Sequence, residues 1–256
     1  MSANSPRPSL EAVRAVAQPA SIFERNSGEH WAGRLYVRRY SAQLTRLLIP
    51  TPVTPNQLTW LMLVVGLAAA AVLTLPGIWP AVAAALLIQG QILLDCSDGE
   101  LARWRQVSSP VGIYLDRIGH YLTEAALPIA LGIRAGGDHV ELGLVAAILV
   151  LLVKSETALV TVARAEAGKP LAADTTEVAA PRATGLRRAR QMLGYVPFFR
   201  AFVAMEATLL ALGAAIVDEA DGSLVGSETL VVALVVVGAI TAVGHLAAIL
   251  ASKRLR

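Results

Sequence analysis

Residues 95–120 read DCSDGELARWRQVSSPVGIYLDRIGH and place three aspartates and a histidine inside sequence that is otherwise apolar enough for a lipid bilayer. Asp95 directly follows an Ile-Leu-Leu run, and Asp116 directly follows Val-Gly-Ile-Tyr-Leu. An ionised carboxylate at membrane depth costs roughly 2.5–3.5 kcal/mol on insertion scales. Three of them on one hairpin need a neutralising partner. A divalent cation is the simplest candidate, because carboxylate oxygens are the ligands that hard cations prefer.

The composition of the chain indicates a membrane protein. Of the 256 residues, 55% are hydrophobic and only 16% are charged, and the mean hydropathy is +0.58. This is too apolar for a soluble domain of the same length. Cys96 is the single cysteine, which excludes an internal disulfide and a cysteine-based zinc site. The first 30 residues are polar, so we expect no cleavable secretory signal and expect the first membrane segment to act as the targeting signal.

Apolar runs of about 20 residues predict an all-α, polytopic membrane fold with six transmembrane helices. Residues 33–48 mix arginine with leucine and tyrosine, which is typical of a basic interfacial helix, although a soluble amphipathic helix packing on the domain is the alternative. Residues 1–32 are predicted to be a disordered N-terminal segment, and residues 168–190 a loop with little fixed structure. Within the membrane domain, residues 33–256, the predicted spans are 58–77, 79–101, 111–134, 139–163, 198–218 and 228–251.

The basic residues predict the orientation in the membrane. Nearly all of the 22 lysines and arginines precede the first span, follow the last, or lie between spans two and three or four and five. The loops on the opposite side have Arg134 as their only basic residue, and they include the acidic run Asp218-Glu219-Ala220-Asp221. Positive residues favour the cytoplasmic side, so we expect both termini and the active site to face the cytoplasm across the plasma membrane. The cluster Arg187-Arg188-Arg190 fits this signal, and attraction of anionic lipid or a charged substrate is the alternative.

The second predicted span carries acidic and very small residues on one face. Asp95 and Asp98 are three residues apart and therefore share a helix face, which Gly99 and Ala102 extend with almost no side-chain bulk. Such small residues would let a bulky ligand, for example a nucleotide pyrophosphate, approach the backbone. Arg103 lies one turn beyond Gly99, where it could contact a phosphate.

The third predicted span carries a second polar face. Asp116, His120 and Glu124 are spaced by four residues and therefore lie on one side of the helix. Because the two spans form a hairpin, we expect Asp95 and Asp98 to meet Asp116 and His120 about one to two turns below the cytoplasmic surface. A neutral imidazole at this position could accept a proton or ligate a metal, and Glu124 could fix its tautomer.

The motif resembles the signature of the CDP-alcohol phosphotransferase family, D-x2-D-G-x2-A-R-x8-G-x3-D-x3-D. One position departs, because His120 stands where the family has its last aspartate. The resemblance extends over about residues 33–250, and the segment TPNQLT at 54–59 also resembles the start of the family's first span. The matching positions are Asp95, Asp98, Gly99, Ala102, Arg103, Gly112 and Asp116.

The resemblance implies transfer of a phosphoalcohol group from a CDP-alcohol to a hydroxyl, with release of CMP. It also implies a divalent metal, Mg²⁺ or Mn²⁺, and commonly a homodimer. In the family the first three aspartates bind metal and the last is the proposed general base, a role that His120 would take here unless it is a further metal ligand. The implied metal ligands are Asp95, Asp98 and Asp116, and the CDP moiety would be bound by Asp95, Asp98, Gly99, Ala102, Arg103 and Gly112.

CDP-diacylglycerol is the expected donor, and a small alcohol or alcohol phosphate the expected acceptor. A CDP-polyol such as CDP-inositol is the alternative donor, because the basic entry helix and residues 54–59 also resemble the inositol-phosphate branch. We expect no nucleic-acid partner. A membrane chain lined with carboxylates could also be a cation transporter, a non-catalytic scaffold or an inactive relative. A transporter or a scaffold leaves the small residues of the motif unexplained, and the chain has no internal repeat of the transporter kind.

Several polar residues outside the motif lie at similar predicted depth in spans four to six. Lys154, together with Glu124, is a candidate for binding the acceptor, although Lys154 could equally snorkel or pair with a carboxylate. Glu156, Glu206 and His245 lie in the same predicted cytoplasmic half, which suggests one shared polar cavity.

Overall fold

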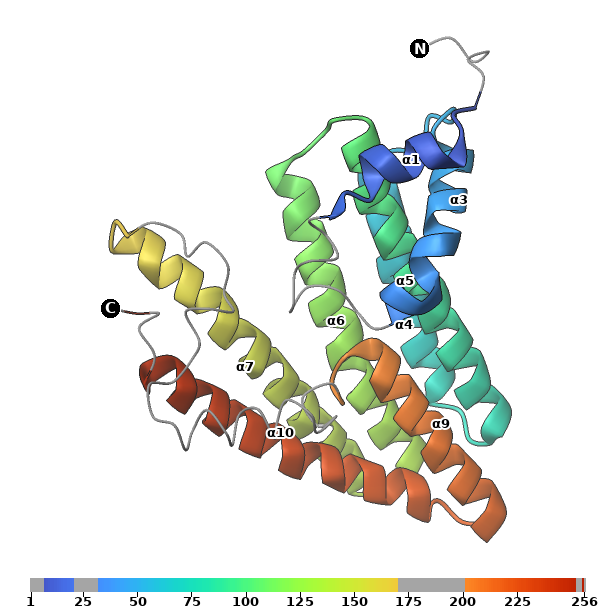
Figure 1. Ribbon diagram of the computed structural model, residues 1–256. Helices are drawn as coiled ribbons and strands as arrows, with labels where there is room; N and C mark the ends of the chain where they lie inside the picture. Colours follow the sequence, from blue (N-terminus) through green and yellow to red (C-terminus); the bar gives the residue numbers. More distant parts are fainter. Residues whose placement is uncertain (1–6, 21–31, 170–200, 252–254, 256) are drawn as a thin grey trace. The chain divides into compact units, whose positions relative to one another are not determined.

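The computed structural model describes residues 7–20, 32–169, 201–251 and 255. Their regular structure is entirely helical, as the sequence predicts (Figure 1). The chain divides into two compact units: unit 1 comprises Met1–Ala68 and Leu86–Leu122, and unit 2 comprises Ala69–Ala85 and Thr123–Arg256. The predicted loop 168–190 and the cluster Arg187-Arg188-Arg190 lie almost wholly outside the described residues.

Long helices occupy the segments that the sequence predicts as spans. Four of them, α4, α5, α7 and α10, are long and apolar enough to cross a membrane, so the chain is a multi-pass membrane protein. The other two, α6 and α9, do not combine the required length with the required hydropathy, so the count of six spans stays a prediction. Residues 198–200 of the fifth predicted span lie outside the described residues. The helices are α4 (Pro55–Leu73), α5 (Ile78–Trp104), α6 (Pro110–Ala135), α7 (His139–Glu166), α9 (Ala204–Asp221) and α10 (Val225–Ala251).

Unit 1 begins with a helix that the sequence did not predict. Helix α1 (Leu10–Ala17) lies within the segment that we expected to be disordered. The Ser9 hydroxyl caps it by accepting a hydrogen bond from the Ala12 N–H at 3.1 Å, and Val13 and Ala17 are fully buried. An isolated helix of this length is unstable in water. Its packing against α3 (Arg38–Leu48) therefore stabilises it, and local sequence could not reveal that contact.

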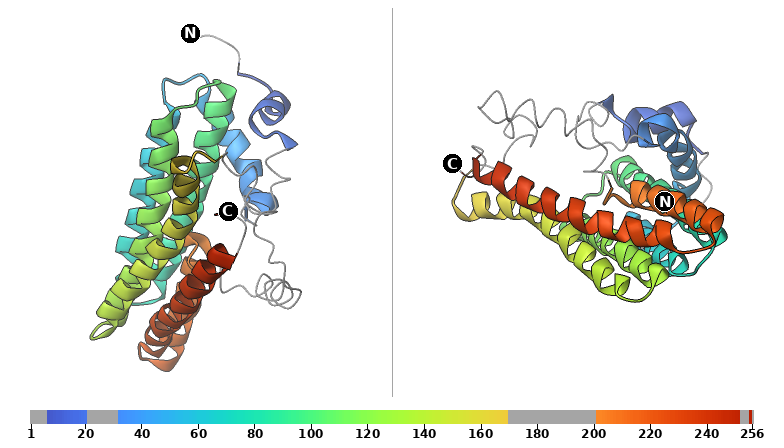
Figure 2. Two further views of the ribbon diagram at one scale, coloured as in Figure 1. Left: turned by 90° about the vertical axis from the view of Figure 1, so that its left-hand side faces the viewer. Right: turned by 90° about the horizontal axis from the view of Figure 1, so that it is seen from below.

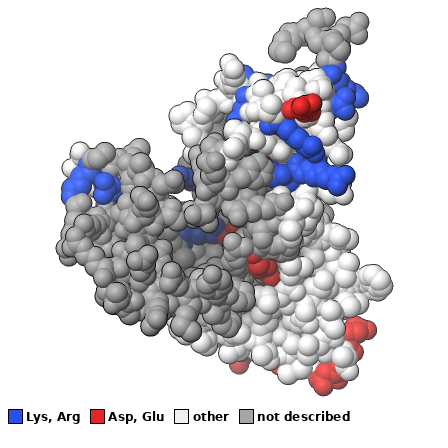
Figure 3. Space-filling model, in the orientation of Figure 1, with Lys and Arg blue, Asp and Glu red and all other residues white. Residues whose placement is uncertain are grey.

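The predicted basic helix is present as a π-helical turn, η1 (Gly33–Val37), that continues directly into α3. Its buried face is small and polar, with Ser41 and Thr45 fully buried, whereas Leu35, Tyr40 and Leu47 are exposed. Figure 3 shows Lys and Arg side chains gathered over α1 and α3. Exposed apolar residues beside arginines are what a headgroup layer would accommodate. The interfacial location itself stays a prediction.

In unit 2, α10 packs along both α7 and α9, and the views in Figure 2 agree on this arrangement. Helices α6 and α7 meet in a tight hairpin whose turn contains Gly136 and Gly137, both with positive φ. A Cβ added to Gly132 would lie 3.0 Å from the Cα of Gly143 and 2.5 Å from the carbonyl oxygen of His139. The two backbones therefore touch at a point where no side chain fits between them.

Arg134, the one basic residue that the predicted topology leaves on the opposite side, is fully buried in unit 2. Its Nη1 donates to the carbonyl oxygens of Leu75 at 2.8 Å and Gly77 at 3.0 Å, and its Nε donates to the Ser227 hydroxyl at 3.0 Å. Asp218 lies 3.5 Å from Nη2 and accepts hydrogen bonds from the Ser227 N–H and hydroxyl. Arg134 is therefore an internal, paired charge that joins the end of α6 to the α4–α5 turn, the end of α9 and the start of α10.

Candidate functional site

The predicted meeting of two acidic helix faces occurs within unit 1. His120 on α6 places its Nε2 3.1 Å from Oδ1 of Asp95 on α5 and 3.5 Å from Oδ1 of Asp116. Potential ligand atoms of these three residues all lie within 4.8 Å of one another. Their side chains are 30%, 44% and 35% exposed for Asp95, Asp116 and His120, so the cluster is open to a ligand.

Asp98 takes a different environment from the other motif aspartates. It is buried, and its Oδ2 accepts a hydrogen bond of 2.6 Å from the hydroxyl of Thr59 on α4. Among the described residues, Asp98 does not belong to the three-residue group around His120. Its predicted metal-binding role stays a prediction, and Thr59, for which helical spacing gave no signal, fixes its orientation.

A cavity of about 430 Å³ in unit 1 collects most of the remaining predicted residues. Its walls come from the start of α4, the end of α5, the following turn and the start of α6. Asp116 connects this cavity to the acidic cluster, because it belongs to both. The predicted residues that line the cavity are Asp98, Gly99, Ala102, Gly112 and Asp116; the others are Thr54, Pro55, Asn56, Thr59, Arg105, Val107, Ser108, Ser109 and Ile113.

The small residues of the motif keep this cavity open and its helices close. A Cβ on Gly112 would lie 3.0 Å from Oδ1 of Asn56 and 3.3 Å from the Ser109 hydroxyl, which is tighter than ordinary packing. A Cβ on Gly99 would lie 3.2 Å from the guanidinium of Arg103. Gly112 therefore lets the beginnings of α4 and α6 approach each other at the cavity wall.

Of the two arginines near the end of α5, Arg105 lines the cavity and Arg103 does not. Arg103 does not line the cavity, and its Nε donates to the carbonyl oxygen of Ala17 at 2.7 Å. Its predicted contact with phosphate stays a prediction. Arg105 lines the cavity and is held by carbonyl oxygens of the segment before α4, at 2.6 Å from Val53 and 2.8 Å from Thr51. The sequence marks Arg105 only as part of the cytoplasmic charge signal.

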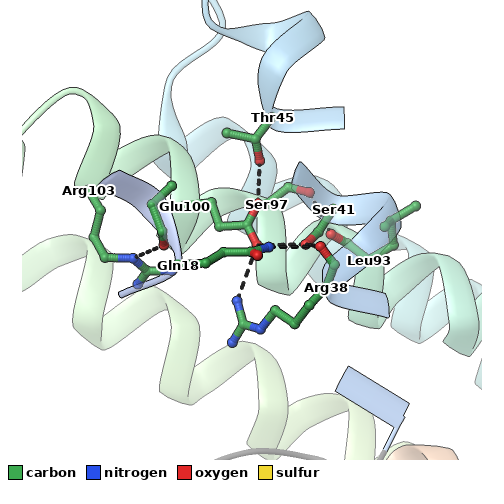
Figure 4. A network of polar contacts seen from close by, with 9 residues as sticks. Gln18, Arg38, Ser41, Thr45, Leu93, Ser97, Glu100 and Arg103 are labelled. Atoms are coloured by element: carbon green, nitrogen blue, oxygen red, sulfur yellow. Dashed lines mark hydrogen bonds and ion pairs between the residues drawn. The ribbon is translucent and has the colours of Figure 1, made fainter. Parts of the chain in front are cut away.

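A buried carboxylate within the motif joins α5 to the N-terminal helices (Figure 4). Glu100 is fully buried, and its Oε1 accepts hydrogen bonds from Ser41 at 2.6 Å and Gln18 at 2.8 Å. Arg38 approaches the same oxygen at 3.3 Å, and Thr45 donates to Oε2 at 2.8 Å. Glu100 occupies an unspecified position of the motif, so spacing gave no signal for it.

The predicted polar residues of unit 2 form two pairs. Lys154 Nζ lies 2.6 Å from Oε2 of Glu124, which is the pairing with a carboxylate that the sequence also allowed. His245 Nδ1 lies 2.9 Å from Oε2 of buried Glu156. The role expected for Glu124, fixing the tautomer of His120, stays a prediction. Acceptor binding by Lys154 and a cavity shared with Glu206 stay predictions.

The donor atoms around His120 fit a divalent cation. Neighbouring ligands in an octahedral shell of about 2.1 Å radius lie about 3 Å apart, and the two nitrogen–oxygen separations here are 3.1 and 3.5 Å. Two carboxylates and one imidazole form a donor set that binds divalent ions readily. Asp95, Asp116 and His120 could therefore hold the metal on which the family generally depends.

Comparison with known proteins gave a family and a fold. The family model described as CDP-alcohol phosphatidyltransferase matches residues 52–217. The fold is similar to that of the Mycobacterium tuberculosis phosphatidylinositol phosphate synthase, whose crystal structure has CDP-DAG bound. The two share 19% sequence identity with a TM-score of 0.55, over 84% of this chain and 96% of that one. A comparison with curated proteins found no match.

The family match covers more than half of the chain and includes the whole 95–120 motif. The likeness to the mycobacterial synthase, at this identity, supports the fold alone. The motif and the matched region agree, so the resemblance seen in the sequence is confirmed. This chain belongs to the CDP-alcohol phosphatidyltransferase family and is a phosphotransferase.

Proposed function

We propose that this enzyme transfers a phosphoalcohol group from CDP-diacylglycerol to the hydroxyl of an acceptor alcohol or alcohol phosphate in phospholipid biosynthesis. The observation that carries this proposal is the cavity of unit 1, which five motif residues from two helices line together. Four apolar helices support a lipid-linked donor, because its acyl chains need a bilayer beside the site. The mycobacterial synthase of similar fold has this donor bound.

The cavity residues are suited to a cytidine diphosphate. Gly99, Ala102 and Gly112 leave the backbone accessible to a pyrophosphate. Arg105 adds a fixed positive charge at the cavity wall, since its guanidinium is anchored by backbone carbonyls. The hydroxyls of Ser108 and Ser109 add neutral polar groups to the same wall.

In the proposed reaction, the acceptor oxygen forms a bond to the β-phosphorus and the bond from that phosphorus to the CMP oxygen breaks. CMP leaves with the electron pair. The acceptor's proton passes to a basic side chain of the cluster, where His120 stands at the family's position for the base. A divalent cation held by Asp95 and Asp116, with Asp98 and His120 as further candidates, would neutralise charge on the pyrophosphate and the transferring phosphoryl group.

CMP release in lipid–detergent micelles tests the proposal. We expect release from CDP-diacylglycerol in the presence of Mg²⁺ or Mn²⁺ and an acceptor, and release from CDP-inositol would favour a CDP-polyol donor. Asp116→Ala should abolish release, and His120→Asp should retain part of it. Asp138→Asn is the matched control, because Asp138 is exposed on the α6–α7 turn. Wild-type rates from Asp116→Ala would refute the site, and metal flux in liposomes without CMP release would favour a transporter.

The orientation, the oligomeric state and the acceptor are part of the same proposal. We infer that both termini and the acidic cluster face the cytoplasm across the plasma membrane, because nearly all basic residues flank that side in the predicted topology. The enzyme is proposed to act as a homodimer. Product analysis with alcohols and alcohol phosphates as acceptors identifies the second substrate.

A further inference from the structure

We propose that His120 binds the divalent cation through Nε2 and that the resulting nitrogen–oxygen–oxygen site selects Mn²⁺ over Mg²⁺. This inference rests on the proposed function, which supplies the need for a metal. It goes further by assigning the histidine to the cation and by naming the ion that the site prefers.

The direction of the imidazole carries the assignment. Nε2 lies 3.1 Å from Asp95 Oδ1 and 3.5 Å from Asp116 Oδ1, so its lone pair or its hydrogen points between the two carboxylates. Neighbouring ligand atoms around one octahedral ion lie about 3 Å apart, so the first separation matches and the second is longer, and all three potential ligand atoms lie within 4.8 Å of one another. The residues come from two helices, α5 and α6, and each remains partly exposed, so an ion can enter.

The chemistry of the donor set determines the ion. A histidine in place of an aspartate removes one negative charge and replaces an oxygen ligand by nitrogen. Mg²⁺ is bound in proteins through oxygen and gives up its water reluctantly. Affinity for imidazole nitrogen rises from Mn²⁺ along the first transition row. Mn²⁺ combines octahedral coordination with tolerance for a nitrogen ligand, so His120 favours it at the expense of Mg²⁺.

The assignment also changes the proton transfer. A nitrogen whose lone pair binds a cation cannot accept the acceptor's proton, and a neutral imidazole bound through Nε2 already carries hydrogen on Nδ1. His120 is then a ligand and not the general base. The acceptor's proton then passes to a carboxylate oxygen of the cluster that is not bound to the cation.

Electron paramagnetic resonance of Mn²⁺ with the purified full-length chain tests this proposal without any substrate. Loss of the free-ion signal gives the Mn²⁺ affinity, and competition gives the Mg²⁺ affinity. Pulsed measurements report a nitrogen nucleus directly bonded to the ion. We expect nitrogen coupling in the wild type and an affinity for Mn²⁺ on the order of tenfold higher than for Mg²⁺.

Two variants separate the ligand from its surroundings. His120→Asp should abolish nitrogen coupling while retaining Mn²⁺ binding, and should shift the preference toward Mg²⁺. His139→Asp, at the start of α7, should keep both wild-type properties. Absence of nitrogen coupling in the wild type, or the same ion preference in wild type and His120→Asp, would overturn the proposal. Failure of CMP release with normal Mn²⁺ binding would count against the donor and not against this site.

Discussion

At the scale of single residues, this site depends on the very small residues of the motif, which leave space for the cavity, as much as on its charged side chains. The meeting of Asp95 with Asp116 and His120 was predictable, because a spacing of four places the last two on one helix face and the hairpin brings the two helices together. The separate environment of Asp98 was not predictable. The positions of Arg103 and Arg105 were not predictable. Helix α5 ends at Trp104 between them, and the backbone carbonyl oxygens that hold Arg105 at the cavity come from the segment before α4, which helical spacing on α5 does not reveal.

Gly112 offers a direct test of the cavity wall. Gly112→Ala would press a methyl group against the side-chain oxygens of Asn56 and Ser109, so these two side chains must move aside at the cavity wall. We expect the KM for the CDP-alcohol to rise several-fold with a smaller change in kcat, because the cavity is the proposed donor site. Steady-state CMP release measures both constants. Gly213→Ala, which has open space around it, is the matched control, and an unchanged KM for Gly112→Ala would count against this wall.

At the scale of elements, the N-terminal helices depend on one buried carboxylate of the motif helix. Helices α4 to α10 were predictable to within several residues, because long apolar runs and turn residues such as Pro76-Gly77 mark their limits. Helix α1 was not predictable, since its stability comes from contacts with α3 and from the capping of its end. Glu100 was missed for a related reason: its partners come from segments about 55 to 82 residues away in the chain.

Removal of the Glu100 carboxylate should loosen unit 1. Glu100→Ala removes the acceptor of the buried Thr45 hydroxyl and leaves the Ser41 hydroxyl only the Arg38 carbonyl oxygen at 3.4 Å. An unsatisfied buried group costs about 1–3 kcal/mol. We expect a lower melting temperature and faster proteolysis within residues 10–48. Glu100→Gln keeps the shape of the side chain and one acceptor oxygen, so its melting temperature should lie between those of the wild type and Glu100→Ala. Wild-type stability of Glu100→Ala would contradict the role of this network.

The buried ion pair between Arg134 and Asp218 is a second contact that holds helices together, here within unit 2. Asp218→Asn removes the charge opposite fully buried Arg134, and breaking one partner of a buried pair costs about 3–5 kcal/mol. The double variant Arg134→Met/Asp218→Asn removes both charges and should be less destabilised than the sum of the single variants. Thermal unfolding in detergent measures all three. Additive losses would show that the two side chains do not interact.

At the scale of the whole chain, the distribution of arginine and lysine predicts the orientation. The one exception in the predicted topology, Arg134, is buried and paired, so it does not act as a free loop charge. Among the described helices, four meet the length and hydropathy of a span, and α6 and α9 do not, so composition alone does not settle the number of crossings.

Single-cysteine labelling in intact cells and inverted vesicles tests this orientation. Cys96 is buried, so the unaltered chain should give little background. Glu11→Cys, exposed on α1, should react with an impermeant reagent only from the cytoplasmic side. Glu219→Cys, exposed near the end of α9, should react only from the opposite side. Reaction of both positions from one side would contradict the predicted topology.

The backbone contact between Gly132 and Gly143 has a consequence for how this sequence can vary. Because main-chain atoms of the α6–α7 hairpin meet directly at these two glycines, exposed apolar side chains on both helices can be exchanged among apolar types without altering the spacing there. Gly226 follows the same pattern, since a methyl group there would collide with the carbonyl oxygen of Ala214. In a saturation mutagenesis scan of unit 2, we therefore expect substitutions at these three glycines to abolish folding or activity, whereas neighbouring positions on the same helices should accept most apolar residues.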